Sequence, residues 1–201
     1  GDNAPYTASD NLSVLEDSLN LYAYSKQQGE RNVIQLERSI ILRCSNMLYP
    51  GRGKFYDFLF DSMVNRKVVG LRVDEYRSFV NALDVVTVIE KVIQKYGRPT
   101  VKVETRVLNV GGNSGLSRLE LGVMLASIHD IEVQVFDDAE AAEQDESIAT
   151  KWRVYKQLNA ECNQNSAIHN PANVTMNIAE TESLLDFTFT PIQEILASLK
   201  K

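Results

Sequence analysis

The chain has 201 residues, 44% hydrophobic and 24% charged, which predicts a folded domain with a packed core rather than a disordered chain. Its net charge of −6, with no basic run, argues against nucleic acid as the main partner. No apolar run approaches the roughly 18 residues of a membrane span, and two cysteines make no disulfide framework, so we expect no membrane contact and a reducing, cytoplasmic compartment.

Hydrophobic periodicity predicts helices and strands that alternate along the chain. The first helical pattern runs from Leu19 or Asn20 to about Leu36. Buried strands are expected at 38–49, 67–73, 105–110 and 131–136, and further helices at 54–66, 82–97, 116–128 and 190–201. The acidic stretch 136–147 is typical of a solvated loop or an exposed helix. Strands that alternate with helices of this length favour an α/β fold with a largely parallel sheet.

The segment "GGNSG" (111–115) lies between a predicted strand and a predicted helix. Backbone N–H groups at such a position could bind phosphate. The alternative, which we prefer, is a turn followed by a helix cap, because Ser117 and Glu120 have the spacing of a capping box. A metal site is not expected, since His129 and His169 have no cysteine or acidic partner at ligand spacing.

The first helix contains the sequence "NLYAYSKQQGE" (20–30). Tyr22 and Lys26 are four residues apart, so their side chains lie one turn apart on the same face, and Tyr24 has no cation at that spacing. An ammonium within about 4–6 Å could lower the pKa of a phenol by one to three units and make it a general acid. Alternatively, Tyr22 packs on the core while Lys26 reaches water or pairs with Glu30.

Several segments, in order, resemble the extended short-chain dehydrogenase/reductase family, in particular its branch of dTDP-4-dehydrorhamnose reductase-like proteins. The segments that carry the resemblance are "APY" (4–6), "LNLYAYSKQQGE" (19–30), "SIILRCSNMLYPG" (39–51), "DEYRSFVNALDVVTVIEKVI" (74–93), "RVLNVGGNSGLSRLELGVMLA" (106–126) and "NPANVTMNIAETESLL" (170–185). They are spread over nearly the whole chain. The regulatory β subunit of methionine adenosyltransferase belongs to a similar branch.

This resemblance implies the C-terminal part of a Rossmann-type NAD(P)-binding α/β fold with a small α/β substrate-binding lobe. The Rossmann part would cover 1–48 and the lobe mainly 49–201, with 78–112 returning to the Rossmann sheet. The cofactor would be NADP or NAD, with NADPH favoured. The implied roles are proton donation and cofactor contact for Tyr22 and Lys26, cofactor contact for Arg43, and substrate contact for Asn46, Arg77, Gly112 and Ser117.

The sequence also departs from the family pattern. It contains no G-x-G-x-x-G turn and no upstream Ser or Thr of the catalytic triad, so it reads as cut from a longer protein. Asn46 stands where rhamnose-forming reductases commonly have an aromatic residue, and Arg77 could bind a phosphate or carboxylate or instead pair with Asp74 or Glu75.

Three functions therefore stay open. The first is a reductase of a 4-keto sugar nucleotide, and the second is a non-catalytic NADP-binding regulatory subunit whose partner is a methionine adenosyltransferase catalytic subunit. The third is a divergent homologue with no activity of its own. A homodimer is possible in each case.

Overall fold

The computed structural model describes residues 4–10, 21–49, 54–98, 100–103, 106–145, 150–158 and 173–200. Its helices are α1 (Leu21–Ile34), α2 (Lys54–Val64), α3 (Ala82–Tyr96), α4 (Arg118–Ile128), α5 (Ala139–Gln144), α7 (Ala179–Leu185) and α8 (Ile192–Ser198). Its strands are β1 (Ile40–Cys44), β2 (Asn46–Leu48), β3 (Val69–Arg72), β4 (Tyr76–Asn81), β5 (Arg106–Val110), β6 (Gly115–Ser117), β7 (Val133–Phe136) and β8 (Trp152–Gln157). The α/β class and the parallel strand pairs predicted from the sequence are both present.

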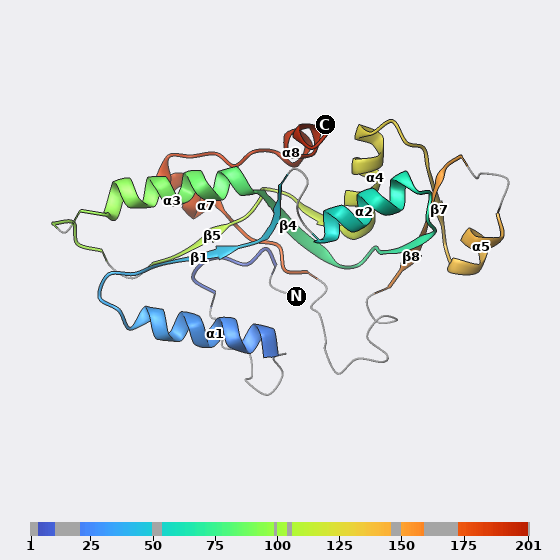
Figure 1. Cartoon of the computed structure of the whole chain (residues 1–201). Helices are drawn as coiled ribbons and strands as arrows, with labels where there is room; N and C mark the ends of the chain where they lie inside the picture. The colour runs from blue at the N-terminus through green and yellow to red at the C-terminus, as the bar shows by residue number, and fades with distance from the viewer. Residues whose placement is uncertain are drawn as a thin grey trace.

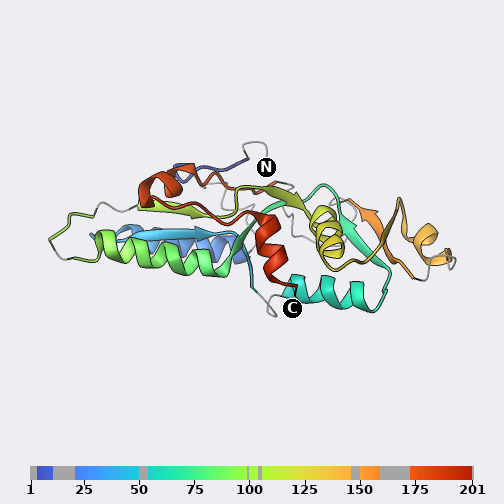
Figure 2. The ribbon, with the colours of Figure 1, turned by 90° about the horizontal axis from the view of Figure 1, so that it is seen from above.

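The molecule is elongated, with a parallel sheet toward each end (Figures 1 and 2). At one end β1 pairs with β5, in a register that sets Ile40 opposite Arg106. At the other end β8 lies between β3 and β7, and both pairs are parallel. Figure 1 shows α3 and α7 on one side of the β1–β5 pair and α1 on the opposite side.

Strand β4 lies between these two sheets, at the centre of a third sheet (Figure 1). It pairs in parallel with β2, which sets Asn46 opposite Phe79, and antiparallel with β6, which sets Arg77 opposite Leu116. Since β2 begins two residues after β1 ends, the chain passes directly from the β1–β5 pair into this central sheet. The middle of the molecule therefore gathers segments from several parts of the sequence.

The hydrophobic side chains form two cores. The larger core lies beneath α2, α4 and α8, and its fully buried members include Leu59, Met63, Leu71, Leu121, Leu125, Trp152, Val154 and Leu196. The smaller core joins the β1–β5 end to α3 and the C-terminal segment through Val80, Val85, Val88, Val110, Ile178, Leu185 and Phe189. Each core is built from residues distant in the sequence, so neither can form from one local segment alone.

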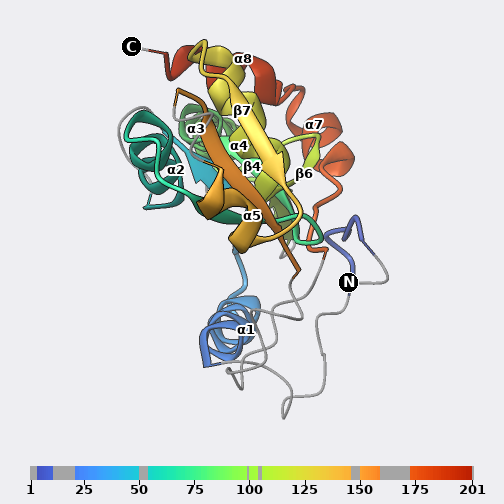
Figure 3. The ribbon, with the colours of Figure 1, turned by 90° about the vertical axis from the view of Figure 1, so that its right-hand side faces the viewer.

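Helix α1 differs from the other long helices because none of its residues, 21–34, is buried. Leu21 is 83% exposed and Ile34 is 50% exposed. Figure 3 shows α1 set apart from the rest of the molecule. Within the part of the chain that the structure describes, α1 is therefore attached through polar contacts and through its connection to β1.

The single strand predicted at 38–49 is in fact two, β1 and β2, separated at Ser45. The chain leaves the β5 partner after Cys44 and joins β4 at Asn46, so the two short strands belong to different sheets. Within the described ranges, no helix combines the length and the apolar character that crossing a bilayer requires.

Candidate functional site

The residues that the sequence singled out lie in two groups. The first group, on α1 and β1, consists of Tyr22, Lys26 and Arg43. The second group surrounds the central strand β4 and consists of Asn46, Arg77, Gly112 and Ser117.

Tyr22 and Lys26 meet on one face of α1, as their spacing predicts. The Lys26 Nζ atom lies over the Tyr22 ring, 5.4 Å from its centroid. This is a cation–π contact, which places the ammonium against the ring face. Tyr22 is 72% exposed, so the alternative in which it packs on the core is wrong.

Arg43 connects α1 to β1. Its Nε and Nη2 atoms donate to the two carboxylate oxygens of Glu30, each at 2.9 Å, and its Nη1 donates to Ala8 O at 3.2 Å. Glu30, the alternative partner of Lys26 in the sequence interpretation, is thus bound by Arg43. This two-point ion pair fixes the orientation of α1 relative to the strand.

A cleft of about 280 Å³ opens beside β2 and β4. Its walls combine aromatic, aliphatic and cationic side chains, and they are Asn46, Met47, Leu48, Phe55, Tyr56, Arg77, Phe79 and Arg118. A second hollow of about 180 Å³ also includes Asn46 and Arg77, together with Ser45 and Ser78. Two of the predicted substrate residues, Asn46 and Arg77, therefore line the same two cavities.

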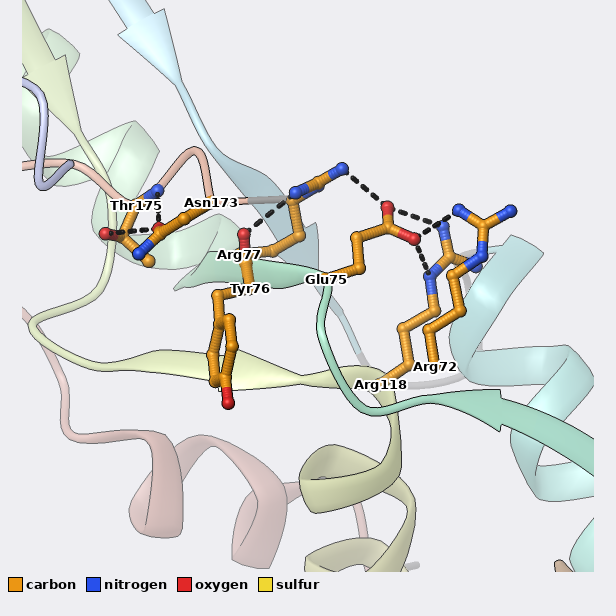
Figure 4. Close-up of polar contacts among 7 residues, drawn as sticks. All are labelled: Arg72, Glu75, Tyr76, Arg77, Arg118, Asn173 and Thr175. Atoms are coloured by element: carbon orange, nitrogen blue, oxygen red, sulfur yellow. Dashed lines mark hydrogen bonds and ion pairs between the residues drawn. The ribbon is translucent and has the colours of Figure 1, made fainter. Parts of the chain in front are cut away.

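The two cleft arginines are both bound by one buried carboxylate, that of Glu75, which is 2% exposed (Figure 4). Arg77 Nη2 lies 2.5 Å from Glu75 Oε1, and Arg118 Nε lies 3.3 Å from Oε2. Arg72 also donates to Glu75. Of the two carboxylates suggested as partners for Arg77, the structure places Glu75 in contact.

The charges of this cluster shift its ionisation. Burial by itself would raise the pKa of the Glu75 carboxyl, but the hydrogen bond from Arg72 and the charges of Arg77 and Arg118 outweigh burial and lower the pKa. The pKa of Arg77 is lowered by burial, and by repulsion from Arg118 and Arg72, although Glu75 opposes the shift. Glu75 is therefore ionised at neutral pH, and the arginines repel one another.

Gly112 and Ser117 have packing and capping contacts. A Cβ atom on Gly112 would lie 1.9 Å from Phe79 O, so only glycine allows the backbone to approach β4 at this point. The Ser117 hydroxyl accepts from Glu120 N at 3.1 Å, and Glu120 Oε2 accepts from Ser117 N at 2.6 Å. The predicted capping box is present, and it begins α4 directly at Arg118.

Arg118 and the aromatic wall of the cleft were missed from the sequence. The Arg118 guanidinium lies over the Phe55 ring, 4.6 Å from its centroid. The cap at Ser117 places Arg118 in the first turn of α4, but only the pairing of β6 with β4 brings that turn beside Arg77. Over the described ranges, no group of three or more His, Cys, Asp or Glu residues is arranged to hold a metal ion.

No family model matches this chain, and no curated protein matches it by sequence. Solved structures do match. The dTDP-4-dehydrorhamnose reductase of Bacillus anthracis strain Ames, in complex with NADP, matches with a TM-score of 0.70 at 17% identity. The match covers 96% of this chain and 58% of that one. A dTDP-glucose 4,6-dehydratase from the same organism, in complex with NAD, has a TM-score of 0.68 at 15% identity, over 99% of this chain and 55% of that one.

A third match is MoeE5 in complex with UDP-glucose and NAD, with a TM-score of 0.64 at 19% identity, over 89% of this chain and 53% of that one. The chain thus spans a little more than half the length of each of these proteins. Likeness at this level of identity establishes the fold alone, which is the Rossmann-type α/β fold that these NAD(P)-bound structures share.

Proposed function

We propose that this chain carries the proton-donating and substrate-binding parts of an NAD(P)H-dependent reductase that acts on a 4-keto sugar nucleotide. The observation that carries the proposal is the continuity of the segment 21–48. Tyr22 and Lys26 lie on α1, Arg43 connects that helix to β1 through Glu30, and the next strand lines the arginine cleft. The acid and the ligand cleft are therefore held by consecutive elements.

The residues present fit the nicotinamide-ribose end of such a cofactor. Tyr22 is exposed, and the Lys26 ammonium one turn away can donate hydrogen bonds to ribose hydroxyls. The sequence has no G-x-G-x-x-G turn for the phosphates. A bound reduced nicotinamide would supply hydride to the carbonyl carbon. Tyr22 would donate its proton to the carbonyl oxygen, and the Lys26 charge would stabilise the phenolate left behind.

A nucleotide sugar suits the cleft chemically. Guanidinium groups bind phosphate oxygens through paired N–H donors, and Arg77 and Arg118 both line the cavity. Asn46 provides no aromatic surface, but Phe55 and Tyr56 of α2 and Phe79 of β4 are among the residues that line the cavity. The dTDP-4-dehydrorhamnose reductase among the structural neighbours makes a dTDP-4-keto sugar the first substrate to test.

The proposal is tested by following NADPH oxidation with dTDP-4-keto-6-deoxymannose. We expect the substitution Tyr22→Phe to reduce kcat by roughly 10²–10⁴-fold, the usual contribution of a general acid. The matched control is Tyr24→Phe, which removes a phenol from the same helix, two residues away, where no lysine follows one turn later. Equal losses for both variants would contradict the assignment of Tyr22.

An exposed apolar stripe on α3 supports a second candidate, a partner-binding role. Leu83, Val86 and Ile93 share one side of the helix and are 60%, 51% and 61% exposed. The partner would be a methionine adenosyltransferase catalytic subunit or a second copy of this chain. This role is tested by co-purification with that subunit. Co-purification, combined with no NADPH oxidation by the unaltered protein, would favour this role over the reductase.

A further inference from the structure

Glu75 connects three arginines from three different elements. It lies in the turn between β3 and β4, where Arg72 ends the first strand and Arg77 is the second residue of the next. Arg118 is the first residue of α4. Figure 4 shows all three guanidinium groups directed toward the one carboxylate. The side chain of Glu75 is only 2% exposed, so its carboxylate belongs to the folded interior, whereas Arg118 reaches the surface.

Two of these arginines, Arg77 and Arg118, line the cleft, and both contact Glu75. Arg118 contacts the carboxylate through Nε and Nη2, each at 3.3 Å, while one face of its guanidinium lies over Phe55. These contacts use two of its three nitrogens, so N–H donors are left for a ligand. Arg77 is held by Glu75 Oε1 at 2.5 Å and by Tyr76 O at 2.8 Å. Each of the two guanidinium groups is thus in contact with the Glu75 carboxylate.

We propose that Glu75 is a positioning residue that orients Arg77 and Arg118 to bind the phosphate groups of a ligand in this cleft. The proposal rests on the proposed function in one respect, since it takes a nucleoside diphosphate group to be the natural occupant. Phosphate oxygens match the fork of N–H donors on a fixed guanidinium, and the aromatic walls suit the attached organic part.

Positioning and charge predict opposite changes in anion affinity when Glu75 is neutralised. Judged by charge alone, a carboxylate near the cleft repels an anion, so its removal should tighten anion binding. Judged by position, its removal releases three guanidiniums that repel one another, and the repulsion from Arg118 and Arg72 already lowers the pKa of Arg77. If positioning dominates, neutralising Glu75 weakens anion binding although the protein becomes more positive.

The experiment measures the binding of UDP and of inorganic pyrophosphate to the purified full chain by calorimetry, without cofactor or sugar. We expect Glu75→Gln to weaken the binding of both ligands by about 10-fold or more, which is the usual loss for one charged hydrogen bond. The control Asp130→Asn makes the same change in charge at a residue that is 83% exposed and pairs with Lys200. Asp130 lies past the far end of α4, which rises about 15 Å from Arg118 to Ile128. The affinity of this variant for UDP and pyrophosphate should therefore change by less than about twofold.

Glu75→Gln protein that melts like the unaltered chain and binds UDP equally or more tightly would overturn the proposal. If that variant does not fold, Arg118→Lys serves instead, because it keeps the charge but loses the planar fork. We expect about 10-fold weaker binding for it, and unchanged affinity would also overturn the proposal.

Failure of the unaltered chain to bind UDP or pyrophosphate would be equally decisive against it. By contrast, UDP binding that depends on Glu75, with no NADPH oxidation, would count against the reductase alone.

Discussion

Asn109 lies in β5 with its side chain buried, and its amide nitrogen donates to Tyr6 O at 2.8 Å and to Asn177 O at 3.1 Å. The hydroxyl of Thr181 donates to the Asn109 carbonyl at 2.7 Å. One buried amide thus joins the N-terminal segment, the strand and the C-terminal segment. A buried polar group is costly unless it is hydrogen-bonded, so these contacts also make this arrangement of the three segments specific.

Gly112 provides a residue-scale prediction. The substitution Gly112→Ala places a Cβ atom 1.9 Å from Phe79 O, a backbone atom that can move only with β4. We expect the free energy of unfolding to fall by roughly 1–3 kcal/mol, as overpacking usually costs. The measurement is the urea midpoint.

Gly29→Ala is the matched control, since nothing lies within 4 Å of the Cβ it would add and α1 is helical there. For this control we expect the free energy of unfolding to rise by up to about 1 kcal/mol, because alanine favours a helix more than glycine does. If Gly112→Ala matched the unaltered chain in stability, the close approach to β4 would be wrong.

Helix α4 shows how one element prepares the cleft. Its capping box fixes the first turn, and that turn presents Arg118 to Glu75 and to the ring of Phe55. Strand β6 leads into the helix and pairs with β4, which carries Arg77. The geometry of the cleft therefore depends on where α4 begins, in addition to the arginines themselves.

An element-scale prediction follows for Ser117. The substitution Ser117→Ala removes the acceptor for Glu120 N, so we expect a loss of about 1 kcal/mol in the free energy of unfolding, within a range of about 0.5–2. Ser127→Ala is the control, because Ser127 is exposed in the same helix and alanine there has the higher helix propensity. Thermal melts of the two variants should move in opposite directions, and an equal shift would argue against the cap.

At the scale of the whole molecule, the two cores and the ion cluster between them act together. The smaller core holds α3 and α7 to the β1–β5 pair, and the larger one holds α2, α4 and α8 to the sheet around β8. The Glu75 cluster joins residues from β3, β4 and α4 near the centre of the chain's fold. Breaking a buried ion pair costs about 3–5 kcal/mol, so this cluster is a sensitive point for global stability.

Acid should therefore destabilise the protein through Glu75. The pKa of this carboxyl is lower in the folded chain than in the unfolded one, so the unfolded state binds more protons as the pH falls. The stabilisation is present above the unfolded pKa and is lost as the pH falls through the folded pKa. Denaturant midpoints for the unaltered chain and for Glu75→Gln should converge in acid, and a difference that does not change with pH would contradict this.

His129 should also make the folded protein less stable as the pH falls, beginning at a higher pH than Glu75 does. Burial lowers the pKa of its imidazole and the charge of Lys200 lowers it further, although Asp130 partly opposes both. The folded state therefore favours the neutral ring, and protonation favours unfolding. The acid sensitivity of the chain should begin near the pKa of an unperturbed histidine, about 6.5, and increase as Glu75 protonates.

Much of the fold could be predicted from local patterns. The long amphipathic helix at 82–97 and the capped helix at 116–128 appear as α3 and α4, within two residues of their expected ends. Strand β8 was missed although its residues alternate, with Trp152 and Val154 buried and Arg153 and Tyr155 partly exposed. Strand β4 was missed because it is buried over three consecutive residues and so lacks a period of two.

The candidate site was predicted only in part. Helical spacing alone was enough to bring Tyr22 to Lys26, and the same reasoning identified the cap at Ser117, because both involve residues within one turn of each other. The roles assigned to these residues stay predictions. The contacts of Arg118 with Glu75 and with Phe55 could not be found this way, since no local rule relates residues so far apart in the sequence.

Local chemistry determines where helices begin, which side chains share a helical face and which runs are apolar, because these depend on neighbours within a few residues. Only the tertiary structure decided that the run at 38–49 divides between two sheets, that Arg43 rather than Lys26 binds Glu30, and that one buried carboxylate holds three arginines beside a cleft. In each case several partners, distant in the sequence, could pair with the same strand edge or the same charge. Which of them does so depends on the folded arrangement of the whole chain.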